Sequence, residues 1–169
     1  MKIRDRIKEL RRVPASSLRP NPKNWRTHPK EQADALRGTL AEIGFAEAVV
    51  ARELPDGSLE LIDGHLRAET VGDGEVPVLV LDVTEEEADK LLVTLDPLAA
   101  MATVDAEALA SLVETVETDS EALRQMIDDL ALEEGITSPE FSPATLDDQG
   151  KLDEKAPIQC PECGHEFTT

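Results

Sequence analysis

The feature that most constrains the fold of this chain lies within residues 62–67, where an apolar strand gives way to a helix. Residues 58–62 alternate between apolar and polar side chains, as a half-buried strand does. Residues 66–71 contain no helix breaker, and Gly64 stands between the two segments. Glycine lets the backbone turn sharply and lets another group approach it closely. The sequence therefore predicts a strand, a turn at Gly64 and a helix.

The predicted turn is also a natural place for an anion. The first N–H groups of a helix have no partner within the helix, and the helix dipole adds partial positive charge there. Arg67 has a fork of donors that can hold a phosphate at two points, and the charge of His65 can change near neutral pH. In the alternative interpretation, Asp63 only caps the helix, Gly64 only turns the chain, and Arg67 pairs with a surface carboxylate. These residues alone leave both interpretations open.

The segments around this turn predict a small α+β domain over residues 13–97. Four strands are expected, at residues 13–18, 47–53, 58–62 and 76–81. A helix is expected from Pro29 to Gly44, and its buried stripe is predicted at Ala33, Leu36, Leu40 and Ile43. The order strand, helix, hairpin, helix, strand combines local and crossover pairings. It predicts a small mixed sheet with flanking helices.

The N-terminal segment differs in charge from the rest of the chain. The net charge is −19, yet ten of the seventeen Lys and Arg residues lie within residues 1–30. Ile3, Ile7 and Leu10 recur at helical spacing, which predicts a basic amphipathic helix over residues 1–12. Since DNA affinity comes largely from cations that neutralise phosphates, any contact with DNA must use residues 1–30. The alternative is an arm that docks on the acidic body of the same chain.

Helical patterns continue after the predicted domain. Thr84 and Glu87 form a capping box, and the helix that follows is expected to end at Pro97. Residues 103–134 predict an acidic helical hairpin, with helices that begin near Asp105 and Ser120. This hairpin either packs against the domain or forms a docking surface for a basic partner or a second copy of the chain.

The composition changes again after this hairpin. Residues 135–157 are rich in Ser, Pro, Asp and Gly, which predicts a flexible linker. Within residues 158–169, Cys160, Cys163 and His165 resemble one knuckle of a zinc ribbon. A closed zinc site needs a fourth ligand, from elsewhere in this chain or from another chain in a homodimer. The alternative is a degenerate tail with two free thiols.

Three motifs in order along residues 13–95 resemble the ParB/sulfiredoxin superfamily. They are a segment rich in Asn and Arg at residues 21–26, a box of helix, glycine and valine-rich strand at residues 36–52, and the glycine turn that ends in Arg67. The small ParB-like domains of phages and mobile elements, often found beside or fused to DNA methyltransferases, are the most similar members. The resemblance implies a nucleotide cofactor, CTP or ATP with Mg²⁺. The nucleotide-binding residues that it implies are Asn24, Arg26, Asp63, Gly64, His65 and Arg67.

Departures from the family pattern limit the chemistry. Sulfiredoxins resemble this stretch with a cysteine where His65 stands, so the sulfinic-acid chemistry has no nucleophile here. Partition-type ParB proteins carry several arginines around the turn, whereas only Arg67 matches here, which predicts weaker triphosphate binding. The sequence after residue 100 does not resemble the helix-turn-helix DNA reader of the family.

Two classes of function follow. The first is a ParB-like nucleotide-binding module for DNA modification, segregation or mobile-element biology. Some relatives hydrolyse or transfer phosphate or act as nucleases, and His65 and Asp63 are the only candidates on the turn for such catalysis. The second is a non-catalytic acidic adaptor that binds a partner such as a DNA methyltransferase. No apolar run approaches the length of a membrane span and no signal peptide is present, so a cytoplasmic location is expected.

Overall fold

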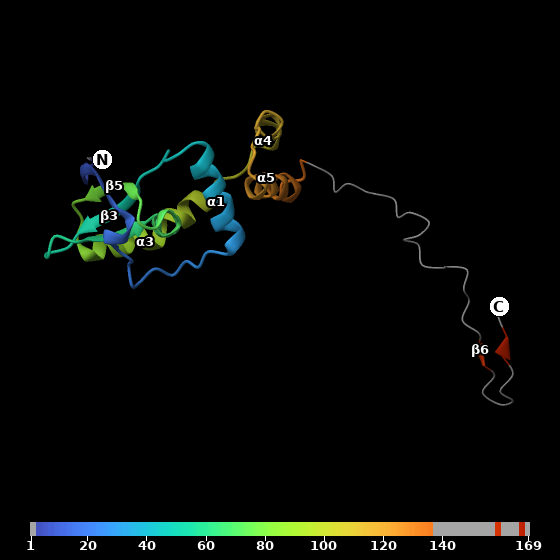
Figure 1. Ribbon diagram of the computed structural model, residues 1–169, viewed down its shortest axis with the longest axis horizontal. Helices are drawn as coiled ribbons and strands as arrows, with labels where there is room; N and C mark the ends of the chain where they lie inside the picture. The colour runs from blue at the N-terminus through green and yellow to red at the C-terminus, as the bar shows by residue number, and fades with distance from the viewer. Residues whose placement is uncertain (1–2, 137–157, 160–165, 168–169) are drawn as a thin grey trace. The chain divides into compact units, whose positions relative to one another are not determined.

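The computed structural model describes residues 3–136, 158–159 and 166–167. The chain divides into two compact units, residues 1–137 and 138–169 (Figure 1). In the second unit, β6 (Ile158–Gln159) pairs antiparallel with β7 (Glu166–Phe167). The predicted zinc ligands Cys160, Cys163 and His165, and most of the predicted linker, lie outside the described residues. No helix in the described ranges is long and apolar enough to cross a membrane.

The first unit is built on a mixed sheet, as the sequence predicts, but the sheet has five strands where four were predicted. Its strands are β1 (Ile7–Pro14), β2 (Leu18–Arg19), β3 (Val49–Glu53), β4 (Leu59–Asp63) and β5 (Glu75–Leu81). Their order across the sheet is β1-β5-β3-β4-β2. The β1/β5 and β3/β4 pairs are antiparallel, and the β3/β5 and β2/β4 pairs are parallel. Every predicted strand segment therefore contributes to one sheet, but residues 13–18 are divided between the end of β1, a short 3-10 helix and β2.

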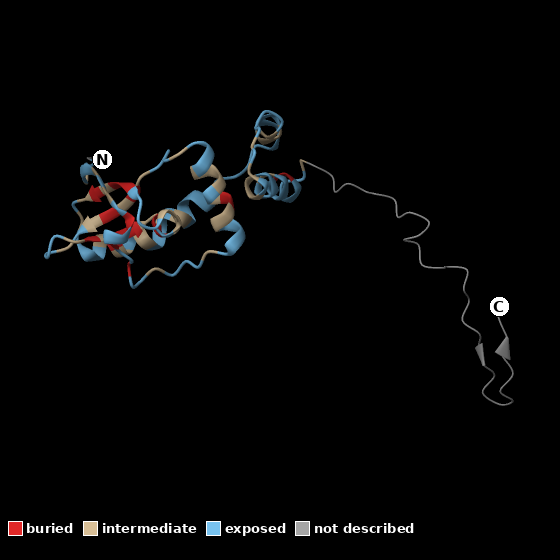
Figure 2. Ribbon diagram, viewed as in Figure 1, coloured by how far each residue is buried: buried red, intermediate tan, exposed pale blue. Residues whose placement is uncertain are grey.

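The buried residues gather on the strands of this sheet (Figure 2), and the core cluster includes alternate strand residues, which share one face. Val76, Val78 and Val80 alternate along β5 and are fully buried, and Val49 and Ala51 do the same on β3. Helix α2 (His65–Val71) covers this face and contributes Ala68, while the 3-10 helix η1 (Ala15–Ser17) contributes Ala15. With so few aromatic residues, the chain builds its core from closely packed Val, Leu and Ala side chains.

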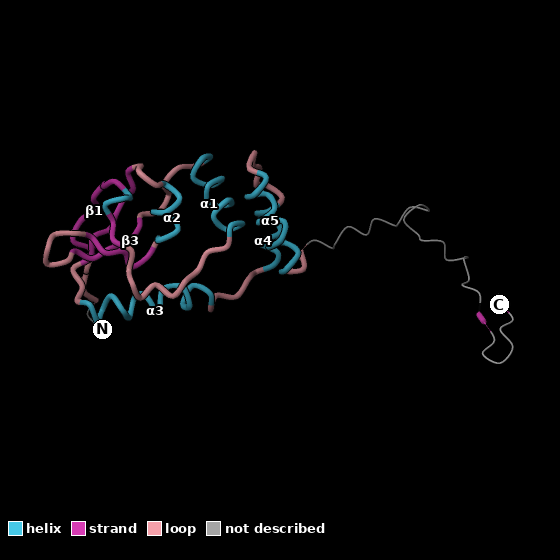
Figure 3. The backbone as a smooth tube through the Cα atoms, turned by 60° about the horizontal axis from the view of Figure 1, so that its bottom comes forward, coloured by secondary structure: helices cyan, strands magenta, loops and turns pink. Residues whose placement is uncertain are grey.

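Helix α3 (Glu85–Ala100) covers the opposite face of the sheet (Figure 3). Arg52 on β3 and Glu60 on β4 form a largely buried ion pair there, 2.7 Å between Nη2 and Oε1. The predicted capping box is present, because Thr84 and Glu87 each bond to the backbone N–H of the other. The predicted end of the helix at Pro97 was wrong. Proline removes one backbone donor but fits the helical φ angle. The helix therefore continues through Pro97 to Ala100.

Three further helices stand at the end of the sheet (Figure 1). Helix α1 (Lys30–Glu42) contacts α5 (Glu121–Glu133), and α4 (Ala106–Val113) packs on α5. The helices begin where predicted, since Asp105 and Ser120 cap α4 and α5. The predicted stripe of α1 was partly wrong. Ile43 follows the helix and is 70% exposed, whereas Ala35 is the buried residue of the helix.

The contact between α1 and α5 depends on a small residue and a carboxylate. A Cβ atom at Gly38 would lie 2.7 Å from the Cβ atom of Ser120, so only glycine allows the helices to come this close. Glu42 accepts hydrogen bonds from the hydroxyl of Thr118 and from the backbone N–H groups of Asp119 and Ser120. These bonds, that of Thr118 foremost, lower the pKa of Glu42. Of the two alternatives for the hairpin, packing against the domain is therefore present, through α5.

The predicted N-terminal helix was wrong, because Ile7–Pro14 form strand β1. The backbone of these residues pairs with the open edge of β5, and this tertiary pairing overrides a weak local preference for helix. An irregularity between Ile7 and Glu9 interrupts the strand alternation. Ile7 and Leu10, which were predicted to form the apolar stripe of a helix, are both more than half exposed, at 53% and 56%.

The basic N-terminal segment pairs with the acidic body of the same chain. Eight of the ten Lys and Arg residues in residues 1–30 form ion pairs: Arg4, Arg6, Lys8, Arg11, Arg19, Lys23, Arg26 and Lys30. The contact of Arg6 is the most complete, since its two Nη groups bond to both oxygens of Glu87 at 2.7 Å. These bonds, together with the backbone N–H of Thr84, lower the pKa of Glu87 to about 2. The alternative in which the N-terminal segment docks on the acidic body of the same chain therefore describes the structure. The docked segment is a strand, and not a helix.

The Arg6–Glu87 pair predicts a specific acid sensitivity. The pKa of Glu87 is lower in the folded chain than its ordinary value of 4.5, so the unfolded chain binds this proton first as the pH falls. Stability from the pair is complete above pH 4.5 and is lost as the pH falls toward about 2. Glu87→Gln keeps a capping amide but removes the charge. In urea unfolding across this pH range, we expect the variant to lose less stability than the parent on acidification, while Glu86→Gln, at an exposed position beside it, behaves like the parent.

Candidate functional site

The predicted turn at Gly64 has the geometry that the sequence indicates. β4 ends at Asp63, and α2 begins at His65. Gly64 has a φ angle of 86°, in the left-handed region that side chains disfavour. A Cβ atom at this position would lie 2.7 Å from Cγ1 of Val49 on the neighbouring strand β3. Both the backbone angle and the packing therefore require glycine.

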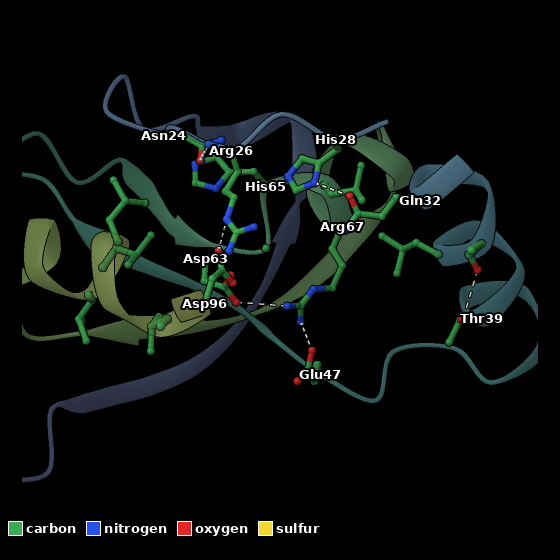
Figure 4. Close-up of a pocket in the computed structure, with 18 of the residues that line it drawn as sticks. Asn24, Arg26, His28, Gln32, Thr39, Glu47, Asp63, His65, Arg67 and Asp96 are labelled. Atoms are coloured by element: carbon green, nitrogen blue, oxygen red, sulfur yellow. Dashed lines mark hydrogen bonds and ion pairs between the residues drawn. The ribbon is translucent and has the colours of Figure 1, made fainter. Parts of the chain in front are cut away.

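A cavity of about 370 Å³ opens beside this turn (Figure 4). Its walls come from the loop of residues 20–29, from α1, from the start of α2 and from α3, with Met126 of α5 at its edge. All six residues predicted to bind a nucleotide line it: Asn24, Arg26, Asp63, Gly64, His65 and Arg67. The fold thus brings together two segments that are about forty residues apart in the sequence.

The guanidinium of Arg67 points toward the cavity but bonds to groups of the same chain (Figure 4). Its Nη1 donates to the carbonyl oxygen of Ala48 at 3.2 Å and lies 2.8 Å from Oε2 of Glu47. Its Nη2 donates to Oδ2 of Asp63 at 3.2 Å. The alternative interpretation, in which Arg67 pairs with a carboxylate, therefore describes the structure without a ligand. A bound anion must share or replace these partners.

Arg26 belongs to a loop that is attached to α3. Its Nε lies 2.9 Å from Oδ2 of Asp96, and its guanidinium lies 4.4 Å from the centre of the Trp25 ring. The indole Nε1 of Trp25 donates to the carbonyl oxygen of Leu92 at 3.2 Å. Lys23 adds ion pairs to Glu85 and Asp89. Contacts at three positions along the loop thus fix one wall of the cavity.

His65 is buried and holds the start of this loop. The backbone N–H of Asn21 donates to its Nε2 at 3.3 Å. Burial lowers the pKa of His65 below its ordinary value, so the imidazole is neutral at pH 7. Its first role is to position residues of the loop, and it does not add positive charge to the cavity. Asn21, which is also buried, was missed as a site residue even though it belongs to the same Asn-rich segment as Asn24.

Several other cavity residues carry no signal in the sequence. Glu47, Asp96, Gln32, Thr39 and His28 add polar groups, and His28 Nδ1 bonds to Oε1 of Gln32 at 3.0 Å. An apolar part is formed by Leu36, Leu91, Leu92, Leu95 and Met126. The cavity is therefore amphipathic, with guanidinium groups and carboxylates beside an aliphatic surface. Only the folded chain reveals this set, because its members come from five separate segments.

Positive and negative groups are nearly balanced in the cavity. Two guanidinium groups, those of Arg26 and Arg67, face the carboxylates of Glu47, Asp63 and Asp96. Within the described part of the chain, no group of three or more His, Cys, Asp or Glu side chains is arranged to hold a metal ion. These carboxylates are held by arginines, so a divalent cation would have to arrive with an anionic ligand that takes over those arginines.

Comparisons with known proteins agree with this architecture. No family model matches the sequence. Two curated proteins, the nucleoid occlusion proteins of Geobacillus sp. (strain WCH70) and Geobacillus kaustophilus (strain HTA426), are 29% identical over 125 residues and 28% identical over 133 residues. These matches cover 70% and 75% of this chain but only 44% and 47% of the relatives, so the chain spans less than half of their length.

A solved structure supports the fold. The C-terminally truncated chromosome-partitioning protein ParB from Caulobacter crescentus, in complex with CTP-γ-S, is similar with a TM-score of 0.55 and 20% sequence identity. The similarity covers 75% of this chain and 71% of that one. At this identity the likeness concerns the fold alone.

The geometry of the turn predicts the effect of a side chain at Gly64. In Gly64→Ala, the left-handed backbone and the contact with Val49 should together lower the free energy of unfolding by about 2–4 kcal/mol. Gly57 is a matched control, since its φ angle is 83° but a Cβ atom there meets nothing within 4 Å. Gly57→Ala should cost only about 1 kcal/mol. Equal losses for the two variants in urea unfolding would contradict the packing argument.

Proposed function

We propose that this chain, which has the ParB/sulfiredoxin fold that its sequence predicts, is a nucleotide-binding module of a DNA-associated process. The observation that carries the proposal is the cavity at the Gly64 turn, where the six predicted binding residues meet. The fold is shared with a ParB protein in complex with CTP-γ-S. The nucleoid occlusion proteins, as sequence relatives, support the DNA-associated part of this proposal.

The two parts of the cavity suggest how a nucleotide would lie. Arg67 and Arg26 would bind the phosphates, because guanidinium forks match phosphate oxygens in two places. The aliphatic part, formed by residues such as Leu36, Leu92 and Met126, would receive the base or the ribose. We propose CTP or ATP with Mg²⁺, since a divalent ion would offset the nearby carboxylates and chelate the phosphates.

We assign binding and positioning roles to Asp63 and His65. Asp63 orients Arg67, and His65 holds the loop through Asn21. A general base needs an acceptor within hydrogen-bond reach of the proton that it removes, and Nε2 of His65 already accepts one hydrogen bond. Nucleotide binding is therefore the function that this geometry supports best. Hydrolysis or nuclease activity would require these two residues to exchange their present partners.

Contact with DNA through residues 1–30 is a further part of the proposal. In the structure, Glu87 neutralises Arg6 and Glu53 neutralises Lys8. DNA phosphates would therefore have to replace these carboxylates. Such an exchange is strongly salt-dependent.

The second candidate function is a non-catalytic adaptor for a partner such as a DNA-modifying enzyme, or for a second copy of the chain. One observation favours it: large apolar side chains are exposed near the end of α3 and on α4, namely Leu98, Met101, Val104 and Leu112. Exposed apolar groups beside acidic helices are typical of docking surfaces. An adaptor would keep its partner when Arg67 is removed and would bind no nucleotide.

Removal of Arg67 tests the proposed function. Calorimetric titration of CTP, ATP and GTP with Mg²⁺ should give binding of at least one nucleotide to the parent protein. Arg67→Ala should weaken it by about tenfold to a hundredfold, because a hydrogen bond to a charged group contributes about 1.5–3 kcal/mol. Arg37→Ala is the matched control, since Arg37 is an exposed, ion-paired arginine on α1 that does not line the cavity. Absence of nucleotide binding by the parent protein, with intact partner binding, would favour the adaptor.

A further inference from the structure

The segment between α1 and β3 places a carboxylate on the arginine that the proposed function assigns to phosphate. Glu47 lies in this segment, and its Oε2 is 2.8 Å from Nη1 of Arg67 (Figure 4). The side chain of Glu47 is 77% exposed, whereas that of Arg67 is only 17% exposed. An accessible anion thus covers a largely buried cation at the cavity.

The three partners of Arg67 differ in how readily a ligand could replace them. The carbonyl of Ala48 belongs to the backbone next to β3, and Asp63 stands one helical turn from Arg67 on the same unit of strand, turn and helix. These two partners fix the direction of the guanidinium. Glu47 reaches it from an exposed segment, and its carboxylate already lies mostly in solvent, so it can return to water without a change in the backbone. Glu47 is therefore the partner that leaves at least cost.

The segment that carries Glu47 has room to move. Ile43, Phe45 and Ala46 are all exposed, and Gly44 has a positive φ angle with nothing near its Cβ position. The side chain of Glu47 can therefore swing away from Arg67 without disturbing the core. The Arg26–Asp96 pair at the same cavity is different, because it also ties the loop of residues 20–29 to α3. Removal of Asp96 would change both charge and loop position, so Glu47 is the cleaner probe.

We propose that Glu47 is an internal competitor, which occupies the phosphate position on Arg67 and must be displaced by the anionic part of a ligand. The inference rests on the proposed function of this cavity as a nucleotide site. Glu47 lowers affinity in two ways, since it neutralises Arg67 in the empty site and repels phosphate charge in the filled one. The Glu47–Arg67 pair would thus select ligands by their charge. Only a ligand with several negative charges would replace the carboxylate.

The substitution Glu47→Gln tests this role. It keeps the shape of the side chain and removes its charge, so affinity for the nucleotide that the parent protein binds should rise by about three- to tenfold. Inorganic tripolyphosphate, as a probe of the phosphate position alone, should show a similar gain. Both gains should shrink as salt screens the exposed charge. Asp73→Asn is the matched control, since it removes one negative charge from an exposed turn outside the cavity and should leave affinity unchanged.

The outcomes separate this inference from the proposed function. If Arg67→Ala loses nucleotide binding while Glu47→Gln binds no better than the parent, the site stands and the competitor role is wrong. An equal gain in Asp73→Asn would also overturn it, because the effect would then come from net charge alone. If neither the parent nor Glu47→Gln binds any nucleotide or tripolyphosphate, the proposed function fails together with the inference. Thermal unfolding of each variant checks that the fold is intact.

Discussion

The close contact of Gly64 with Val49 is the constraint on which the rest of the structure depends. It brings the start of α2 directly against the central strand β3, with no space for a side chain between them. This contact fixes where His65 enters the core and where Arg67 emerges beside Ala48. The loop of residues 20–29 is then placed by its bond to His65 and by its contacts with α3. The cavity is the space that these anchored segments leave.

Charge is distributed so that carboxylates of the chain neutralise most cations of its basic N-terminal segment. The basic N-terminal segment carries most of the cations, and ion pairs join it to carboxylates on β3, α3 and the turn after β3. The same pattern recurs on a smaller scale in the cavity, where each arginine has a carboxylate partner. A protein of this kind would bind phosphate only by exchange of these carboxylate partners. Because salt weakens these internal ion pairs as well as the contacts with phosphate, its affinity for nucleotide or DNA should depend on salt less steeply than the number of its cations suggests.

The sequence predicted those parts of the fold that depend on local chemistry. The glycine turn, the capping box at Thr84 and the starts of α4 and α5 were correct because the responsible residues are adjacent in sequence. Residues 7–12 were assigned to a helix in error, since their conformation is decided by the edge of β5, far along the chain. The six residues that the family resemblance implied all line one cavity. The resemblance did not indicate Glu47 or Asp96. Their importance comes from their arginine partners, and those contacts exist only in the folded chain.

The attachment of Trp25 to α3 has a practical consequence. The chain has one tryptophan and no tyrosine, so its near-ultraviolet emission arises from a single indole. That indole donates to Leu92, lies against the guanidinium of Arg26, and belongs to the loop that forms a cavity wall. Any rearrangement of Arg26 therefore alters the electric field at the ring. The protein therefore has an intrinsic fluorophore beside the cavity. A change in the emission wavelength or intensity of Trp25 would report a ligand in the cavity without an added label.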